Sequence, residues 1–126
     1  LGKASGTMSA RAVAKNAPLS AQKVRLVADL VRNKTVNEAV DLLHYNGNRA
    51  SHIVGRLLKS AVANAAELDA TEAWHDGADL DSEALFVKKI FVDEGVTMKR
   101  IRPRARGMAF RVLRRRCHIT LEVDDR

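Results

Sequence analysis

The chemistry that this sequence concentrates is anion binding by arginine. In the eighteen residues 99–116, nine are Lys or Arg and none is Asp or Glu. The whole chain holds 22 Lys and Arg against 15 Asp and Glu, so the other residues carry 13 basic against 15 acidic side chains. Nine like charges repel one another in a compact form unless a polyanion lies against them. The basic segment therefore predicts a nucleic-acid partner.

A catalytic alternative rests on the chain's single cysteine. Cys117 stands beside His118, as a thiol nucleophile beside its base would. Adjacent side chains of a strand point to opposite faces, so the pair is badly placed for proton transfer. We interpret Cys117 as a packing residue, and the sequence lacks a phosphate-cradling Gly-Lys-Ser/Thr motif. A hydrolase is the least favoured of three hypotheses, and we predict that the chain is not an enzyme.

Two features of the sequence could indicate a metal site: the histidines and an acidic run. Residues 67–83 hold seven Asp and Glu and no Lys or Arg, but without the spacing of a calcium loop. We interpret the run as a solvated loop whose Trp74 packs against the body, the alternative being a partner anchor. A lone cysteine disfavours structural zinc. No metal and no cofactor is predicted, because ligand spacing is missing from His44, His52, His75 and His118.

Strands are the elements that would position the arginines. Arg100, Arg102, Arg104 and Arg106 recur at every second residue, which places them on one side of an extended chain. Residues 113–123 alternate apolar and polar side chains and predict one strand, and 85–92 predict another. With Pro103 and Gly107 as turn residues, the strands form an antiparallel hairpin.

This hairpin is too long to lie wholly on a core. Only its ends near Val92 and Ile119 carry enough apolar residues to join one, and the far half offers Arg, Lys and small side chains. A bare two-stranded ribbon is marginally stable in water. We therefore predict a hairpin that projects from a globular body and is ordered by what it touches.

Helices are expected before the strands. Ser20 and Asn48 are predicted N-caps, and Thr35 with Glu38 forms a capping box. Asn33 suits the left-handed end of the first helix. The predicted buried stripes are Val24, Val27, Leu30 and Val31, then Val36, Ala39, Leu42 and Leu43, then Ile53, Val54, Leu57, Leu58, Ala61, Val62 and Ala65.

The predicted class is α+β, with three helices packed on a small antiparallel sheet and a long protruding β-hairpin. One domain is expected over 1–126: an N-terminal arm at 1–17 that ends in an edge strand, helices at 18–66, the acidic loop at 67–83, and sheet and hairpin at 84–124. A hydrophobic content of 46% allows a core, and no apolar run is long enough to span a membrane. The lone cysteine indicates a reducing compartment. No signal core is seen, and a start at Leu1 leaves open a removed organellar presequence.

The nucleic acid is expected to be folded RNA. Aromatic residues make up 4% of the chain, too few for a stacking platform, and no helix-turn-helix, zinc finger or basic zipper is present. An extended probe that contacts backbone suits the crevices of folded RNA.

Several motifs resemble one family at its spacing. The chain is similar over about 19–124 to large-subunit ribosomal protein twenty-two of the bacterial series, the universal uL-twenty-two family. The matching motifs are SAQKVRLVADLVR at 20–32, SAVANA at 60–65, IFVDEG at 90–95, MKRI at 98–101, PRARG at 103–107 and HIT at 118–120. Met108, where the family usually has a basic or polar residue, departs from it, as do the long acidic loop and the N-terminal arm.

The resemblance implies a structural constituent of the large subunit that binds ribosomal RNA and links its domains during assembly. It implies neighbouring ribosomal proteins and the nascent polypeptide as partners, and a hairpin tip at the wall of the exit tunnel: Arg102, Pro103, Arg104, Ala105, Arg106 and Gly107. The predicted RNA contacts are Lys15, Lys23, Arg25, Lys99, Arg100, Arg102, Arg104, Arg106, Arg111, Arg114, Arg115, Arg116 and His118.

The expected location is the ribosome, in the bacterial cytoplasm or in a mitochondrial or plastid matrix. We expect neither membrane insertion nor a homo-oligomer. The rival hypothesis is a free-standing basic module that binds a membrane surface or a protein partner.

Overall fold

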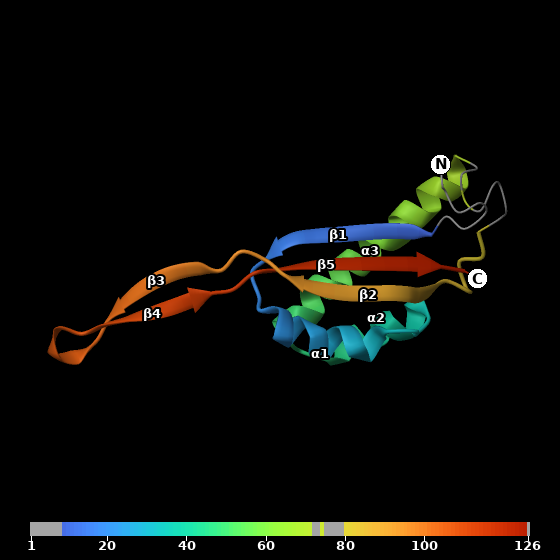
Figure 1. Cartoon of the computed structure of the whole chain (residues 1–126). Helices are drawn as coiled ribbons and strands as arrows, with labels where there is room; N and C mark the ends of the chain where they lie inside the picture. The colour runs from blue at the N-terminus through green and yellow to red at the C-terminus, as the bar shows by residue number, and fades with distance from the viewer. Residues whose placement is uncertain (1–8, 72–73, 75–79, 126) are drawn as a thin grey trace.

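The computed structural model describes residues 9–71, 74 and 80–125. Helices pack on one face of a three-stranded antiparallel sheet, and a two-stranded ribbon projects from it (Figure 1). This confirms the predicted α+β class. The elements are β1 (Ala10–Ala17), α1 (Ala21–Val31), α2 (Val36–Tyr45), α3 (Arg49–Ala70), β2 (Phe86–Glu94), β3 (Met98–Pro103), a 3-10 turn (Ala105–Gly107), β4 (Ala109–Arg114) and β5 (Cys117–Asp124).

Strand β5 is the centre of the body sheet, between β1 and β2. Its inward side chains Ile119, Leu121 and Val123 are fully buried. The period of two along a strand explains this alternation. Strand β1 forms one edge, as expected for the last part of the arm, and its alanines Ala10 and Ala12 allow α3 to pack closely.

The helices cover the sheet through narrower apolar stripes than predicted. On α1, Val24, Val27 and Val31 are buried, but Leu30 is 44% exposed. On α2, Leu42 is 38% exposed, so its predicted burial is also wrong. At 100° per residue, Leu30 lies about 120° around the helix from Val24, outside the side that faces the core.

The helices begin at the predicted residues, but not every predicted N-cap side chain makes a capping hydrogen bond. Thr35 Oγ1 accepts a hydrogen bond from the Glu38 N–H at 3.3 Å, as in a capping box. Ser20 and Asn48 occupy N-cap positions without a side-chain cap bond. Asn33 has φ 63°, the left-handed conformation predicted for it.

The predicted acidic loop begins later than expected. Helix α3 continues to Ala70, so Glu67 and Asp69 are helical. Trp74 is fully buried, as predicted, and its Nε1–H donates to Asp125 Oδ2 at 3.2 Å. The predicted turn at Asp76 and Gly77 lies outside the described residues, and so does His75.

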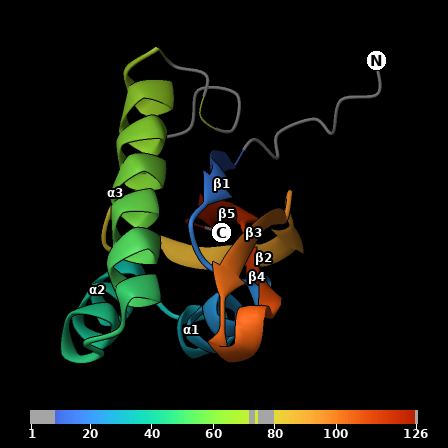
Figure 2. The same cartoon turned by 90° about the vertical axis from the view of Figure 1, so that its left-hand side faces the viewer.

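The projecting ribbon is β3 paired with β4, from Met98 opposite Arg114 to Pro103 opposite Ala109. Figures 1 and 2 show that it leaves the body at the end where β1 finishes and β2 gives way to β3. The single strand predicted for 113–123 is wrong, because it divides between β4 and β5. No helix covers the described ribbon, so Leu113 has no core to enter and is 42% exposed.

Candidate RNA interface

The tip of the ribbon is a tight turn over residues 104–108. The Arg104 N–H donates to the Met108 carbonyl at 2.7 Å, and the Met108 N–H donates to the Ala105 carbonyl at 3.4 Å. Arg106 has φ 62° and Gly107 has φ 69°, so both adopt the left-handed conformation. The extended alternation therefore stops at Arg104. The prediction that Arg106 shares one strand face with the earlier arginines is wrong.

Cationic side chains occupy both faces of the ribbon. Cross-strand pairs lie on the same face, so the register places Arg100, Arg102 and Arg114 on one face with Phe110, while Lys99 and Arg111 lie on the other. All of these side chains are exposed. The ribbon therefore presents positive charge in two opposite directions, which suits a crevice better than a flat surface.

One tip arginine is held by an aromatic ring. The Arg104 guanidinium carbon lies 5.9 Å from the centroid of Phe110, within the range of a cation–π contact. Phe110 is itself 48% exposed. This contact favours one direction for the Arg104 side chain at the tip. We call Arg102, Arg104 and Arg106 the tip arginines.

The ribbon joins the body at a root made by residues 95–97 and 115–116. The Gly95 N–H donates to the Arg116 carbonyl at 2.8 Å. Arg116 Nη1 donates to the Asn16 carbonyl at 3.1 Å, and the Asn16 N–H donates to His118 Nδ1 at 3.1 Å. A Cβ on Gly95 would lie 3.2 Å from the Arg116 carbonyl oxygen, so the two segments of the root are closely packed here. Arg116 and His118 thus hold backbone at the root.

Arg25 also holds backbone near this root. Its Nε and Nη2 donate to the Val92 carbonyl at 3.2 and 2.9 Å. Cys117 lies fully buried on the inner face of β5, while His118 points to the opposite side. Burial raises the pKa of the Cys117 thiol, and the positive charge of Arg25 opposes that rise only in part. A protonated thiol facing away from its neighbour's imidazole is not a nucleophile.

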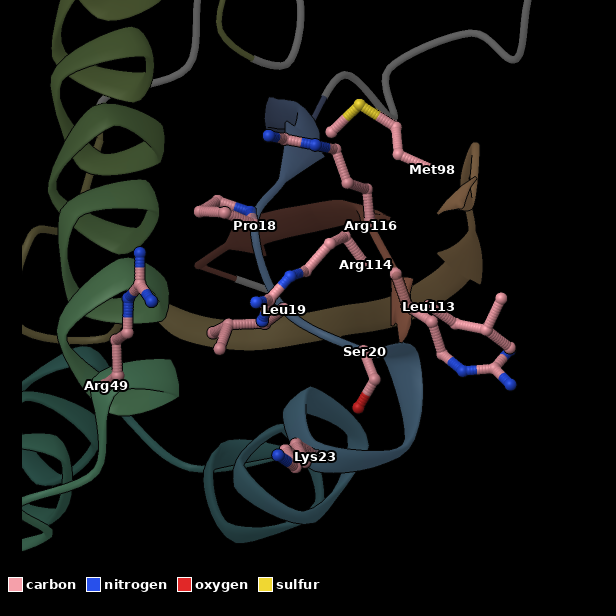
Figure 3. A pocket seen from close by; sticks show the side chains of 10 residues that line it. Pro18, Leu19, Ser20, Lys23, Arg49, Met98, Leu113, Arg114 and Arg116 are labelled. Carbon is pink, nitrogen blue, oxygen red and sulfur yellow. The ribbon is translucent and has the colours of Figure 1, made fainter. Parts of the chain in front are cut away.

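A basic groove of about 570 Å³ lies beside the root (Figure 3). Its cations come from three places in the sequence, and among its lining residues, all within the described part of the chain, none is acidic. Lys23 reaches it from α1 and Arg49 from the start of α3, opposite Arg114 and Arg116 (Figure 3). The lining cations are Lys23, Arg49, Arg114, Arg115 and Arg116.

Arg49 was missed by the sequence reasoning. It stands alone between Asn48 and Ala50, and nothing local marks it. The available signal was helical spacing, because Arg49, His52, Arg56 and Lys59 fall on one side of a helix. Lys15, which was predicted, lies exposed on β1 away from the groove lining.

Two other kinds of feature, a metal site and a membrane-spanning helix, are missing from the part of the chain that the structure describes. No group of three or more His, Cys, Asp or Glu is placed to hold a metal ion there. Within the same residues, no helix has the length and apolar content needed to cross a membrane.

A comparison with models of protein families identifies the family of this chain. The family model described as ribosomal protein L22p/L17e matches residues 12–124. The match runs from within β1 to the end of β5 and so includes the ribbon, its root and the basic groove. The chain therefore belongs to the ribosomal protein L22p/L17e family, and is a structural, non-enzymatic component of the large ribosomal subunit that binds ribosomal RNA and associates with other ribosomal proteins.

Proposed function

We propose that this chain links ribosomal RNA domains during assembly and that its ribbon lines the exit tunnel for the nascent polypeptide. The observation that carries the proposal is positive charge on both faces of a ribbon that projects from the body (Figure 1). An isolated two-stranded ribbon is marginally stable in water. RNA on both sides would neutralise and straighten it, and its tip could then reach a deep site.

The proposed RNA contacts divide into three groups. Lys99, Arg111, Arg115 and the tip arginines are exposed and directed away from the core, and they form the proposed tunnel and RNA surface together with Arg100 and Arg114. Lys15 and Lys23 are proposed to bind RNA from the body. Arg25, Arg116 and His118 remain proposed contacts, but each also holds backbone at or near the root. We add Arg49, because it lines the same groove as Lys23.

Salt dependence tests RNA binding. If six to ten phosphates are contacted, affinity should fall about 10³- to 10⁵-fold between 50 and 200 mM salt. Cosedimentation with the large subunit should be abolished by ribonuclease. A flat salt response, or association with lipid or protein that survives ribonuclease, would favour the membrane- or protein-binding rival.

A crosslinker at the tip tests the tunnel position. Cys117 is buried, so Ala105→Cys would introduce a selectively reactive thiol for a photo-crosslinker. In ribosomes carrying a radiolabelled nascent chain, crosslinks to that chain would support the proposal. Crosslinks to ribosomal RNA alone would leave the ribbon as an RNA anchor and refute the tunnel role. Lys34→Cys, on the exposed loop between α1 and α2, is the matched control and should not reach the nascent chain.

The bacterial series remains a prediction from the motifs at 20–32 and 103–107. We propose on the same basis a ribosome of the bacterial cytoplasm or of an organelle matrix. Mass spectrometry of ribosomes purified from each compartment would identify the particle that contains the chain.

A further inference from the structure

A second groove lies between α2 and α3, away from the ribbon. It has a volume of about 360 Å³. His44 contributes from α2, and His52, Arg56 and Lys59 contribute from α3. Among its lining residues, all in the described part of the chain, none is Asp or Glu. The groove therefore suits an anion.

One side of this groove is the beginning of a long helix. The Asn48 side chain makes no cap bond, so the first turn of the 22-residue α3 keeps unpaired N–H groups and the positive end of the helix dipole. Ser51 lines the groove, is 1% exposed, and its Oγ has no hydrogen-bond partner. Buried hydroxyls are normally paired, so this donor is left for a group from outside the chain.

Gly55 is a third, independent sign. It lies in the middle of α3, where glycine is unfavourable relative to alanine. A Cβ added there would meet nothing within 4 Å, so no internal packing requires the absence of a side chain. Gly55 lines the same groove. Glycine permits close approach of a ligand to backbone, and that is the use we assign to it.

We propose that the α2–α3 groove binds the phosphodiester backbone of ribosomal RNA as a second contact, separate from the ribbon. Arg49, His52, Arg56 and Lys59 share one side of α3 over about 15 Å. Arg49, at the start of this row, lines the groove at the root, whereas His52, Arg56 and Lys59 line the α2–α3 groove. A strand of regularly spaced phosphates matches such a row, whereas a free phosphate ion would fill only one point of it.

The test compares two charge-matched double variants of the full chain, bound to a transcript of large-subunit ribosomal RNA. Arg56→Ala with Lys59→Ala should reduce the slope of log affinity against log salt by about 2. The control, Lys34→Ala with Lys89→Ala, removes two exposed cations outside the groove and should leave the slope nearly unchanged. Equal slopes for the two variants would overturn the proposal.

Gly55→Gln separates binding from folding. Glutamine is a good helix former and would point into open space, so the melting temperature of the free chain should not fall. Its side chain would occupy the groove, and affinity for the RNA transcript should drop several-fold. Unchanged affinity with a normal melting temperature would contradict RNA in the groove.

Two further readouts separate this site from other occupants and from the tunnel. If millimolar inorganic phosphate alone raises the melting temperature of the wild type but not of the Arg56→Ala, Lys59→Ala variant, and the RNA slopes agree, the groove takes a free anion and the proposal fails. Nascent-chain crosslinking from Ala105→Cys does not depend on Arg56 or Lys59. Its failure would therefore refute the tunnel role without affecting the groove.

Discussion

Replacing Gly95 by alanine should change the direction of the ribbon measurably, while the free energy of unfolding should fall only slightly. The added Cβ would lie 3.2 Å from the Arg116 carbonyl oxygen and 3.3 Å from His118 Cε1. These neighbours must move by a few tenths of an ångström. The Gly95 N–H donates a hydrogen bond to the same carbonyl, so the movement disturbs the pairing of the two segments that form the root.

The displacement is amplified along the ribbon. An opening of about 0.3 Å across a strand spacing of about 4.8 Å is a rotation of about 4°. Ten residues separate Gly95 from Ala105, or about 33 Å of extended chain, so the tip should shift by about 2 Å. Overpacking typically costs about 1–3 kcal/mol, and loss of glycine freedom in the unfolded state offsets about 0.4–1 kcal/mol. We expect a net destabilisation of about 1 kcal/mol.

Pulsed electron resonance between nitroxides on Ala105→Cys and Lys34→Cys would measure the shift, while urea unfolding measures stability. Gly47→Ala is the control, because nothing lies within 4 Å of the Cβ it would add. That control should leave the distance between the labels unchanged. If Gly95→Ala also leaves it unchanged, while amide chemical shifts move only next to the substitution, the root does not set the ribbon direction.

Three other substitutions test the tip and the core. Changing the tip arginines to alanine should leave the unfolding midpoint of the body within about 0.5 kcal/mol, by circular dichroism, and lower the salt slope of RNA binding by about 2–3. Burial raises the Cys117 pKa, so its contribution to stability is complete below the pKa of the thiol in the unfolded chain and falls as pH rises past it. Above that pH, the urea midpoint should therefore decline less in Cys117→Ala than in the wild type. Identical declines in the two proteins would contradict a stabilising role of the protonated thiol. Trp74→Phe removes the hydrogen bond to Asp125 and should cost about 1–3 kcal/mol in urea unfolding; no loss would mean that the bond is not stabilising.

The local sequence predicted most of the secondary structure because its signals are short-range. Thr35 with Glu38 marked a helix start, Asn33 a left-handed end, and the alternation around Ile119 a strand. The basic segment predicted a partner from charge alone. These signals depend on neighbours within a few residues, so they are readable without knowing the fold.

Tertiary structure decided which apolar residues are buried. Leu30 and Leu42 fit a helical pattern, yet they remain exposed because the core lies on only one side of each helix. Leu113 belongs to an alternating run but projects beyond the body. Burial needs a partner surface, and periodicity does not say how far that surface extends.

The candidate sites divide in the same way. The sequence by itself determined that the chain carries a concentrated positive charge on a hairpin, because nine basic residues lie within the short segment 99–116. Only the fold brought Arg49 into the same groove as Arg114, turned Arg106 out of the strand, and opened the groove over Gly55. The reason is physical: charge and propensity belong to individual residues, whereas a groove exists only where segments distant in the chain pack together.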